Sequence, residues 1–458
     1  MTHEQEIEVT RMPAHHEVGA APDAAVAAPV RNTGAPSKPR FLGVDVTRGI
    51  ALVAMLAANI YDPLGPDGGP SLAGMTVIGR SATLFVMVAG ISLAFITGGR
   101  HPVQGRARRA ARANIAARAV LIGAIGLALG YVATISVILA YYGAFFLLAI
   151  PLVGLRPRTL AGIAGGLVVV SPLILLASYA LGWSPAFDPL TLTSPLTDPV
   201  GFAQQLLVTG DFPAVTNMAY ICAGLAIGRL NLSSTTVARR LLVGGLATAV
   251  VTWFVSWLVL YPLGGLQHLL AAGAGATPDQ VVWDSETVPS WWWLGLLVHH
   301  SGTPLDMLHT LGCAIAVLGA VLLVTKLPAA RRLLWPIGVA GAMTLTIYSA
   351  HTPLADSDLM GDNLLARYLV IMAVALPFAV LWHKYLGQGP LERFVAAGAN
   401  RARAAVLAAP DRSGVDRRGG HLAPVPAVPR TESRPSDRRI GSDPADRPAS
   451  DPPGSTAR

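Results

Sequence analysis

Histidines beside acidic and hydroxyl residues are the side chains of this sequence with the clearest potential for chemistry. His300, Ser301, Thr303, Asp306 and His309 follow one another where an apolar run begins. Asp306 and His309 are three residues apart and would share one face of a helix. A carboxylate beside an imidazole raises its basicity and fixes its tautomer, which suits a general base working near neutral pH. The alternative interpretation is that each histidine is a hydrogen-bonded packing residue.

Two further polar stripes are expected on the same side of the protein. Thr344, Tyr348 and His351 recur at intervals of four and three residues, so they would share one helix face with His351 at its outer end. Arg80 opens another apolar run. We expect the three stripes to converge on the outer half of a helical bundle and predict His351, His300 or His309 as a general base.

Charged and amide side chains also interrupt the first apolar run. Asp45, Arg48 and Asn59 fall within roughly 60° of one another on a helix that turns 100° per residue. An ionised side chain at the centre of a membrane helix costs about 2.5 to 3.5 kcal/mol, so such residues usually face a polar interior. We predict that these three, with Arg80, Ser301, Thr303 and Tyr348, bind substrate in a buried polar cavity. Alternatively, Asp45 and Arg48 only anchor the cytoplasmic end of the helix.

The composition indicates a polytopic membrane protein. Of the 458 residues, 52% are hydrophobic and 13% charged, and the mean hydropathy is +0.51, whereas soluble domains have about 25% charged residues. The net charge of +8 reflects membrane topology, and we expect no nucleic acid partner. Cys222 and Cys313 lie inside apolar runs, so they predict small packing residues and neither a disulfide framework nor a cysteine-based metal site.

Apolar runs of membrane-spanning length predict an all-α bundle of about ten transmembrane helices. The runs are 42–61, 73–97, 115–132, 134–155, 159–181, 213–230, 240–262, 304–325, 333–351 and 364–384. The connections alternate between basic ones, such as Arg100 to Arg118, and acidic ones, such as Asp356 to Asp362. The positive-inside rule then places the basic loops and both termini in the cytoplasm, with the protein in the cytoplasmic membrane. No broken helices in symmetry-related halves are evident.

The chain divides into three predicted parts. Residues 1–39 and 396–458 are polar and rich in Pro or Ala, and we expect disordered cytoplasmic tails on either side of a membrane domain over 40–395. A long outer connection, 263–303, contains Trp283, Trp291, Trp292 and Trp293. These predict either an interfacial aromatic belt or a platform on which a sugar or acyl group stacks.

The first helical pair resembles a known family. RFLGVDVTRGIALVAMLAAN and GMTVIGRSATLFVMVAGISLA are similar to the opening helices of bacterial relatives of heparan-α-glucosaminide N-acetyltransferase. Later segments, including HHSGTPLDMLHTLGCAIAVLG, GAMTLTIYSAH and LGQGPLERF, resemble that group too. The resemblance implies a membrane acyltransferase that takes an acetyl or other acyl group from cytoplasmic acyl-CoA and needs no metal. Its partners would be membrane lipid and a glycan or small-molecule acceptor with an amine or hydroxyl, and a homodimer is compatible with it.

The sequence departs from the family pattern at one place. The animal enzyme carries its proposed catalytic histidine between the first two spans, whereas residues 61–73 contain none here. Two classes of function therefore stay open. Either a histidine elsewhere deprotonates the acceptor, or the protein is a transporter of a small polar or anionic solute that uses Asp45, Arg48, Arg80 and the histidines for binding and proton relay.

Overall fold

The computed structural model describes residues 41–133, 135–183, 185–273, 276–284, 290–355 and 363–409, and this part of the chain is helical without any β-strand. The long helices are α4 (Gly105–Leu129), α6 (Pro157–Ala180), α10 (Thr235–Leu260), α13 (Pro304–Val324) and α17 (Leu364–Leu386). Shorter bundle helices are α1 (Leu42–Ala58), α3 (Arg80–Ile96), α5 (Ile138–Ala149), α9 (Ala214–Gly228), α15 (Trp335–Gly341) and α16 (Thr344–Ala355). The remaining elements are α2 (Leu72–Thr76), η1 (Leu152–Gly154), α7 (Ser194–Thr197), α8 (Pro199–Gln204), η2 (Gln205–Thr209), α11 (Gly265–Ala272), α12 (Pro278–Trp283), η3 (Trp291–Gly295), α14 (Pro328–Leu333) and α18 (Pro390–Ala408).

The helix lengths confirm a membrane bundle but not ten spans. Within the described residues, six helical segments are long and apolar enough to cross a membrane: 72–96, α4, α6, α10, α13 and α17. The other four predicted runs also contain helices, but α1 has 17 residues, α5 has 12 and α9 has 15. Because a helix rises 1.5 Å per residue, twelve residues cover only about 18 Å of a hydrocarbon core about 30 Å thick.

The predicted ninth span is wrong as a continuous helix. It consists of α15 and α16, which are separated at Ala342 and Met343. A break leaves carbonyl groups at the end of the first half-helix without their usual partners. Arg48 of α1 supplies one donor there, since its Nη1 lies 3.2 Å from the carbonyl oxygen of Gly341. The interruption is therefore stabilised by a polar residue from another helix.

Glycines bring the central helices into close contact. A side chain at Gly224 of α9 would place its Cβ 2.0 Å from the carbonyl oxygen of Met87 in α3, and Gly90 meets Ile221 in the same way. Gly126 of α4 lies equally close to Leu139 and Ala140 of α5. At these contacts the missing side chains of the glycines let the helices pack backbone against backbone.

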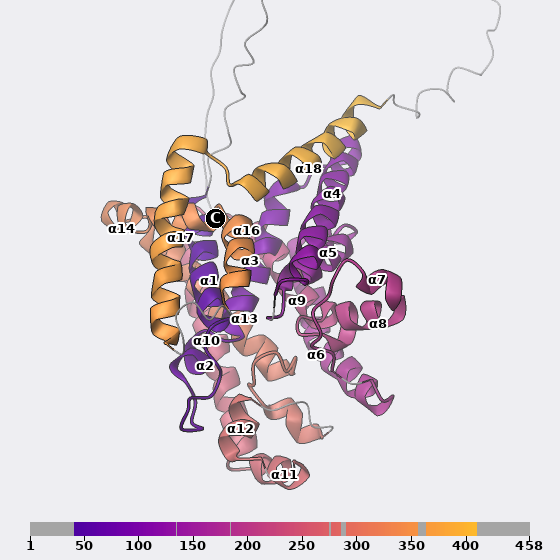
Figure 1. Cartoon of the computed structure of the whole chain (residues 1–458), viewed down its shortest axis with the longest axis vertical. Helices are drawn as coiled ribbons and strands as arrows, with labels where there is room; N and C mark the ends of the chain where they lie inside the picture. The colour runs from indigo at the N-terminus through magenta and orange to yellow at the C-terminus, as the bar shows by residue number, and fades with distance from the viewer. Residues whose placement is uncertain are drawn as a thin grey trace, which may run out of the picture. The chain divides into compact units, whose positions relative to one another are not determined.

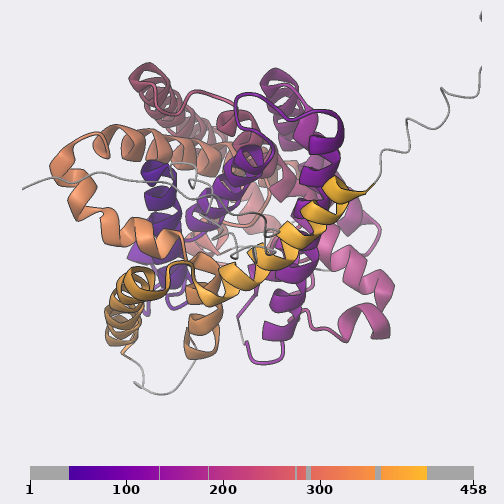
Figure 2. The ribbon, with the colours of Figure 1, turned by 90° about the horizontal axis from the view of Figure 1, so that it is seen from above.

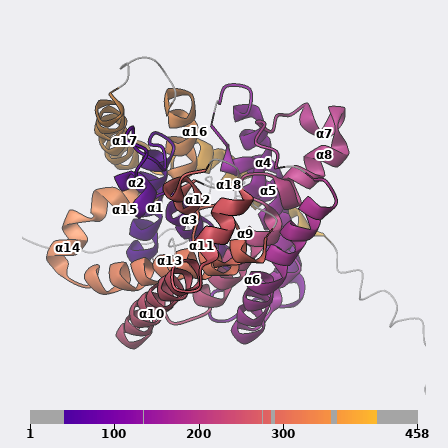
Figure 3. The same cartoon turned by 90° about the horizontal axis from the view of Figure 1, so that it is seen from below.

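Peripheral helices occupy the two ends of the bundle (Figure 1). At one end α18 crosses the bundle (Figure 2), where Arg106 Nε of α4 donates to the carbonyl oxygen of Val406. At the other end lie α11 and α12, seen in front of the bundle in Figure 3. Since α18 continues to Ala408, the helical part extends past the predicted boundary at 395. The predicted tails at 1–39 and beyond 409, and the acidic loop 356–362, lie outside the described residues.

Candidate functional site

Arg80, His309 and Cys313 form a polar cluster where α3 meets α13. Nη2 of Arg80 lies 3.4 Å from Nε2 of His309, and Sγ of Cys313 lies 3.7 Å from the same nitrogen. His309 is buried, while Arg80 and Cys313 are half-buried. A cation, an imidazole and a thiol therefore meet at one nitrogen atom inside the bundle.

The contacts of His309 define its tautomer. Its Nδ1 lies 3.0 Å from the carbonyl oxygen of Ala249 in α10. A carbonyl oxygen can only accept a hydrogen bond, so Nδ1 of His309 carries the proton. In the neutral ring Nε2 then holds a lone pair, which faces Arg80 and Cys313. This is the form of histidine that can take up a proton at Nε2.

Asp306 does not hold His309 in place, contrary to the prediction from their spacing, because the backbone of α10 has that role. Asp306 is 4% exposed, and among the described residues its Oδ1 has no hydrogen-bond partner. Its backbone N–H donates to Oγ1 of Thr303, the N-cap of α13. Thr303 Oγ1 also donates to the carbonyl of Leu296, so this threonine stabilises the start of α13 and is fully buried.

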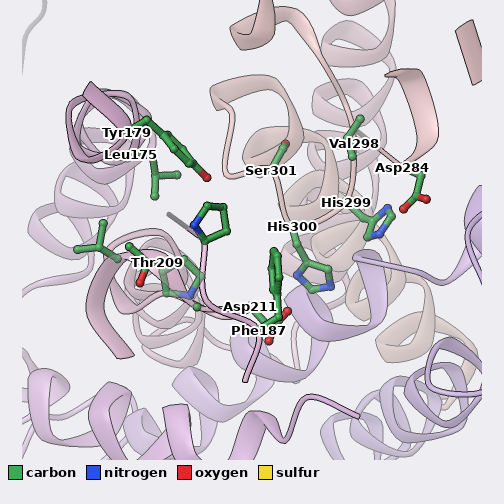
Figure 4. Close-up of a pocket in the computed structure, with 14 residues that line it drawn as sticks. Leu175, Tyr179, Phe187, Thr209, Asp211, Asp284, Val298, His299, His300 and Ser301 are labelled. Atoms are coloured by element: carbon green, nitrogen blue, oxygen red, sulfur yellow. The ribbon is translucent and has the colours of Figure 1, made fainter. Parts of the chain in front are cut away.

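A pocket of about 360 Å³ lies on the predicted outer side and is lined in part by His299, His300 and Ser301, which precede α13. Figure 4 shows His300 beside Asp211 and Phe187, with His299 next to Asp284 and with Tyr179 across the pocket. Asp211, Pro213 and His300 also line a narrow cavity of about 20 Å³ that reaches Asp306 and Thr310. That volume is enough for about one water molecule. The narrow cavity therefore shares three lining residues with the pocket and borders the buried face of α13.

His300 holds a backbone conformation that side chains rarely adopt. Its φ is 58°, in the left-handed region, and it is the only described non-glycine residue with positive φ. Such strain costs on the order of 1 to 3 kcal/mol and is concentrated at functional sites. The ring packs edge to face against Phe212 at 5.0 Å between centroids. The strained turn therefore directs an imidazole to the pocket, where Ser301, also predicted as a binding residue, contributes to the lining.

Electrostatics differ among the pocket residues. Burial, together with the positive charge of Arg80, lowers the pKa of His299 to about 4, so this ring is neutral at pH 7. Burial also raises the pKa of the Asp211 carboxyl above its usual range, although a hydrogen bond from Ser136 opposes that shift. The pocket consequently offers a neutral imidazole and a carboxyl group that is protonated more readily than a solvated one.

Asn59 and His351 form a second cluster between α1 and α16. Nδ2 of Asn59 lies 3.0 Å from Nε2 of His351, and Nδ1 of His351 lies 2.6 Å from the carbonyl oxygen of Tyr348. The proton is again on Nδ1, and Asn59 donates to the lone pair on Nε2. His351 and Tyr348 are 2% and 1% exposed. The predicted shared helix face of Tyr348 and His351 is confirmed. The hydrogen bond between them joins Nδ1 of His351 to the backbone carbonyl of Tyr348 and does not involve the tyrosine hydroxyl.

Arg48 and Asp45 do pair, at 3.1 Å between Nη1 and Oδ1. Nη2 of Arg48 also donates to Oγ of Ser92 in α3 at 2.6 Å. The pair is partly accessible, with side chains 22% and 18% exposed. Arg48 therefore links α1 to both α3 and α15, which is more than a terminal anchor would do.

The tryptophan cluster divides into residues with different roles. Trp293 is fully buried, and Trp292 stacks on His268 at 5.0 Å with nearly parallel rings. Only Trp291 of the three consecutive tryptophans is largely exposed, at 74%. The less exposed rings pack within the outer segment, and the aromatic belt and the stacking platform both stay predictions.

Three residues of the site escaped the sequence analysis. The sequence predicts Cys313 as a packing residue, yet its thiol contacts His309. Asp211 and Tyr220 line the narrow cavity with Asp306 and come from a loop and a helix far from it in sequence. Seven-residue spacing between Asp306 and Cys313 was the one available signal, because it places both on one helix face. No group of three metal-ligating side chains occurs among the described residues.

The apolar helices and buried polar clusters define an integral membrane protein with a polar interior site. Residues 40–261, slightly less than half of the chain, match the family described as heparan-alpha-glucosaminide N-acetyltransferase, catalytic. The match indicates a membrane acetyltransferase-like function. It includes Asp45, Arg48, Asn59 and Arg80, whereas α13 and α16 lie beyond it. No curated protein matches the chain.

Proposed function

We propose that the protein transfers an acetyl or other acyl group from cytoplasmic acyl-CoA to a sugar amine or hydroxyl at the outer side of the membrane. The observation that carries this proposal is the match of residues 40–261 to the catalytic family. The cluster of Arg80 and His309 has the groups that such a reaction needs, namely a proton acceptor and a fixed positive charge.

The chemistry assigns a separate role to each group. Nε2 of His309 removes the proton from the acceptor as the acceptor attacks the thioester carbonyl. The carbonyl oxygen becomes an oxyanion, which the guanidinium of Arg80 stabilises. When the C–S bond breaks, the thiolate of CoA leaves and receives a proton from His309.

The closeness of Arg80 to His309 couples these two events. A proton on His309 would place a second positive charge 3.4 Å from the guanidinium, which is unfavourable while no anion is present. The developing oxyanion neutralises Arg80, so His309 accepts a proton most easily in the transition state. An interaction that strengthens in the transition state is the kind that raises the catalytic rate.

The acceptor would arrive through the outer pocket. His300 and Asp211 line both this pocket and the narrow cavity toward Asp306. On the opposite side, the basic segment from Arg100 to Arg118 would attract the phosphates of the donor. Asn59 and His351 orient α1 against α16, and His351 is the competing candidate for the base.

The test is transfer of radiolabelled acetate from acetyl-CoA by purified protein in detergent, with amino sugars as acceptors. A general base typically contributes about 10² to 10⁴ in rate, so His309→Ala should lose turnover by that factor while it still binds acyl-CoA. His351→Ala and His300→Ala are measured alongside, and His383→Ala, in the last turn of α17 and outside both polar clusters, is the control. Parent rates in all three histidine variants would exclude a histidine base.

The break between α15 and α16 keeps a transporter as the second candidate, because interrupted helices line many solute sites. A transporter would move solute across a vesicle membrane without acyl-CoA. Such flux, together with no label transfer by the parent protein, would favour that function over the enzyme.

A further inference from the structure

Two open hollows lie at the predicted cytoplasmic ends of α10 and α13. The hollow along α14 has a volume of about 550 Å³, and the hollow on the first turns of α10 has a volume of about 500 Å³. Lys326 joins these helix ends, since its Nζ donates to the carbonyl oxygen of Ser233 and to Oγ1 of Thr235. Five basic residues line the two hollows, and we call them the cationic surface: Arg239, Arg240, Lys326, Arg331 and Arg332.

The cationic surface has no negative charge beside it. Among the described residues, no ion pair joins any of its four arginines to a carboxylate. Residues 229–244 and 324–341 contain neither Asp nor Glu, and all five basic side chains are exposed. Retention of positive loops in the cytoplasm accounts for the sign of this charge but not for its position around two hollows. Unpaired guanidinium groups in such a place fit a ligand with phosphate oxygens.

One part of the cationic surface continues into an exposed apolar face of α10. Val243, Leu246 and Val250 follow Arg239 by four, seven and eleven residues, so all four share one helix face. The three apolar side chains are each more than half exposed. The stripe from Arg239 to Val250 is about 16 Å long, and half of a bilayer hydrocarbon core measures about 15 Å. A lipid whose acyl chain covers this stripe therefore has its headgroup at the level of Arg239.

The other hollow combines charge with apolar side chains in the same way. Figures 1 and 3 show α14 projecting from the side of the bundle. Leu327 and Leu333, at the two ends of α14, are 60% and 78% exposed, and Trp335 in the lining of the hollow is 41% exposed. Exposed tryptophan and leucine beside basic residues are typical of helices that lie in the headgroup region of a membrane. Because α14 projects away from the buried polar clusters, its charges are placed for lipid.

We propose that the cationic surface binds the phosphate headgroups of anionic phospholipids, with acyl chains on the exposed stripe of α10. Guanidinium N–H groups donate to the phosphate oxygens, and Trp335 packs at the headgroup level. Basic hollows on the cytoplasmic side of membrane helices are suited to such headgroups. The inference goes beyond the proposed acyl transfer and does not depend on it, because lipid binding requires no acyl donor.

Native mass spectrometry of the purified protein tests this, with phosphatidylglycerol or phosphatidylcholine of the same acyl chains added in detergent. The parent should retain phosphatidylglycerol more tightly than phosphatidylcholine. Each basic residue near an anionic lipid contributes about fivefold in affinity, so loss of the four arginines should weaken phosphatidylglycerol binding by at least about 25-fold. Binding of phosphatidylcholine should not change. The test variant combines four substitutions: Arg239→Gln, Arg240→Gln, Arg331→Gln and Arg332→Gln.

A matched control removes four exposed arginines that line neither hollow, at the same predicted end of the protein. This control should retain phosphatidylglycerol as the parent does, and its substitutions are Arg156→Gln, Arg158→Gln, Arg401→Gln and Arg403→Gln. Lysine at the four test positions keeps the charge and should preserve most of the binding, which separates lost charge from misfolding. Equal losses in the test variant and the control would overturn the proposal, as would equal retention of both lipids by the parent.

Acyl-CoA is the other source of phosphate, and competition distinguishes it from lipid. Phosphatidylglycerol should stay bound to the parent when acetyl-CoA is added, and the test variant should bind acetyl-CoA as the parent does. If acetyl-CoA displaces the lipid and the test variant no longer binds acetyl-CoA, the surface belongs to the donor and the lipid proposal is wrong.

Discussion

Arg48 makes contacts that no shorter side chain could replace. It bridges to Asp45, donates to Ser92, and donates to the carbonyl of Gly341 where the helix breaks between α15 and α16. The planar guanidinium presents several donors in fixed directions, so it can serve three partners at once. Asp45 is also in contact through the backbone, since its carbonyl lies against Gly341.

These contacts predict unequal effects of removing the two charges. Asp45→Asn should lower the thermal unfolding midpoint and the transfer rate. Arg48→Gln should lower both further, because it also removes the hydrogen bonds to Ser92 and to the Gly341 carbonyl. The double variant should be less damaging than the sum, since neither charge is then left alone. Scanning calorimetry in detergent and acetyl transfer would measure this. Mild and additive losses at normal expression would instead show that Asp45 and Arg48 only anchor the end of the helix.

For individual residues, the sequence predicts well which polar side chains are buried. It predicts less well which pairs of side chains are in contact. Residue spacing correctly placed Asp45 beside Arg48, because their separation is set by helix geometry. It failed for Asp306 and His309, since a shared face does not fix rotamers and a backbone carbonyl of α10 competes for the ring. The contact between Asn59 and His351 joins residues 292 positions apart, which no local pattern can reveal.

Close approach of helices is the property that holds the elements together. In α3 and α9, Gly90 and Gly224 meet backbone atoms of the opposite helix. Without a hydrophobic driving force in lipid, association depends on such contacts and on interhelical hydrogen bonds. Arg229, just after α9, adds polar contacts: it is 5% exposed and donates to the carbonyls of Ala94, Thr97 and Gly99 at the end of α3.

Packing at Gly224 can be tested against a glycine in open space. Gly224→Leu should lower the unfolding midpoint by several degrees or prevent folding, because a Cβ there would lie 2.0 Å from the Met87 carbonyl oxygen. Gly244→Leu, in α10, should leave the midpoint within about a degree or raise it, since nothing lies within 4 Å and leucine is the better helix former. Equal destabilisation by both changes would show that side-chain size at Gly224 is not the cause.

Helix positions followed well from the apolar runs, because hydropathy reports burial in lipid directly. The break between α15 and α16 could not be predicted, because together they form one apolar run in the sequence. Polar groups of other helices accommodate the junction: Arg48 donates to the carbonyl of Gly341, and Glu392 accepts from the N–H of Thr346. The start of α3 was hidden for a similar reason: α2 and α3 form one hydrophobic stretch, interrupted at Gly79 by a positive φ of 76°.

Over the whole molecule, the two ends differ in charge. Basic segments, including Arg106 on α4 and Arg393 on α18, gather at the end where α18 crosses, and α11 and α12 mark the other (Figures 1 and 3). Acidic residues such as Asp198 and Asp284 belong to the connections that the loop charges assign to the outside. The sequence predicts this asymmetry because positive loops are retained in the cytoplasm during insertion.

Thiol labelling tests this orientation at three positions with exposed side chains, Arg109, Asp198 and Asp284. Each is replaced by cysteine, and a membrane-impermeant thiol reagent is added to intact cells and to detergent-solubilised protein. All three variants should react in detergent above the parent level, because exposure is the only requirement there. In cells, Asp198→Cys and Asp284→Cys should react while Arg109→Cys should not. If Arg109→Cys reacts in intact cells and the other two variants do not, the predicted orientation is wrong. The pocket of His300 and Asp211 would then lie on the cytoplasmic side.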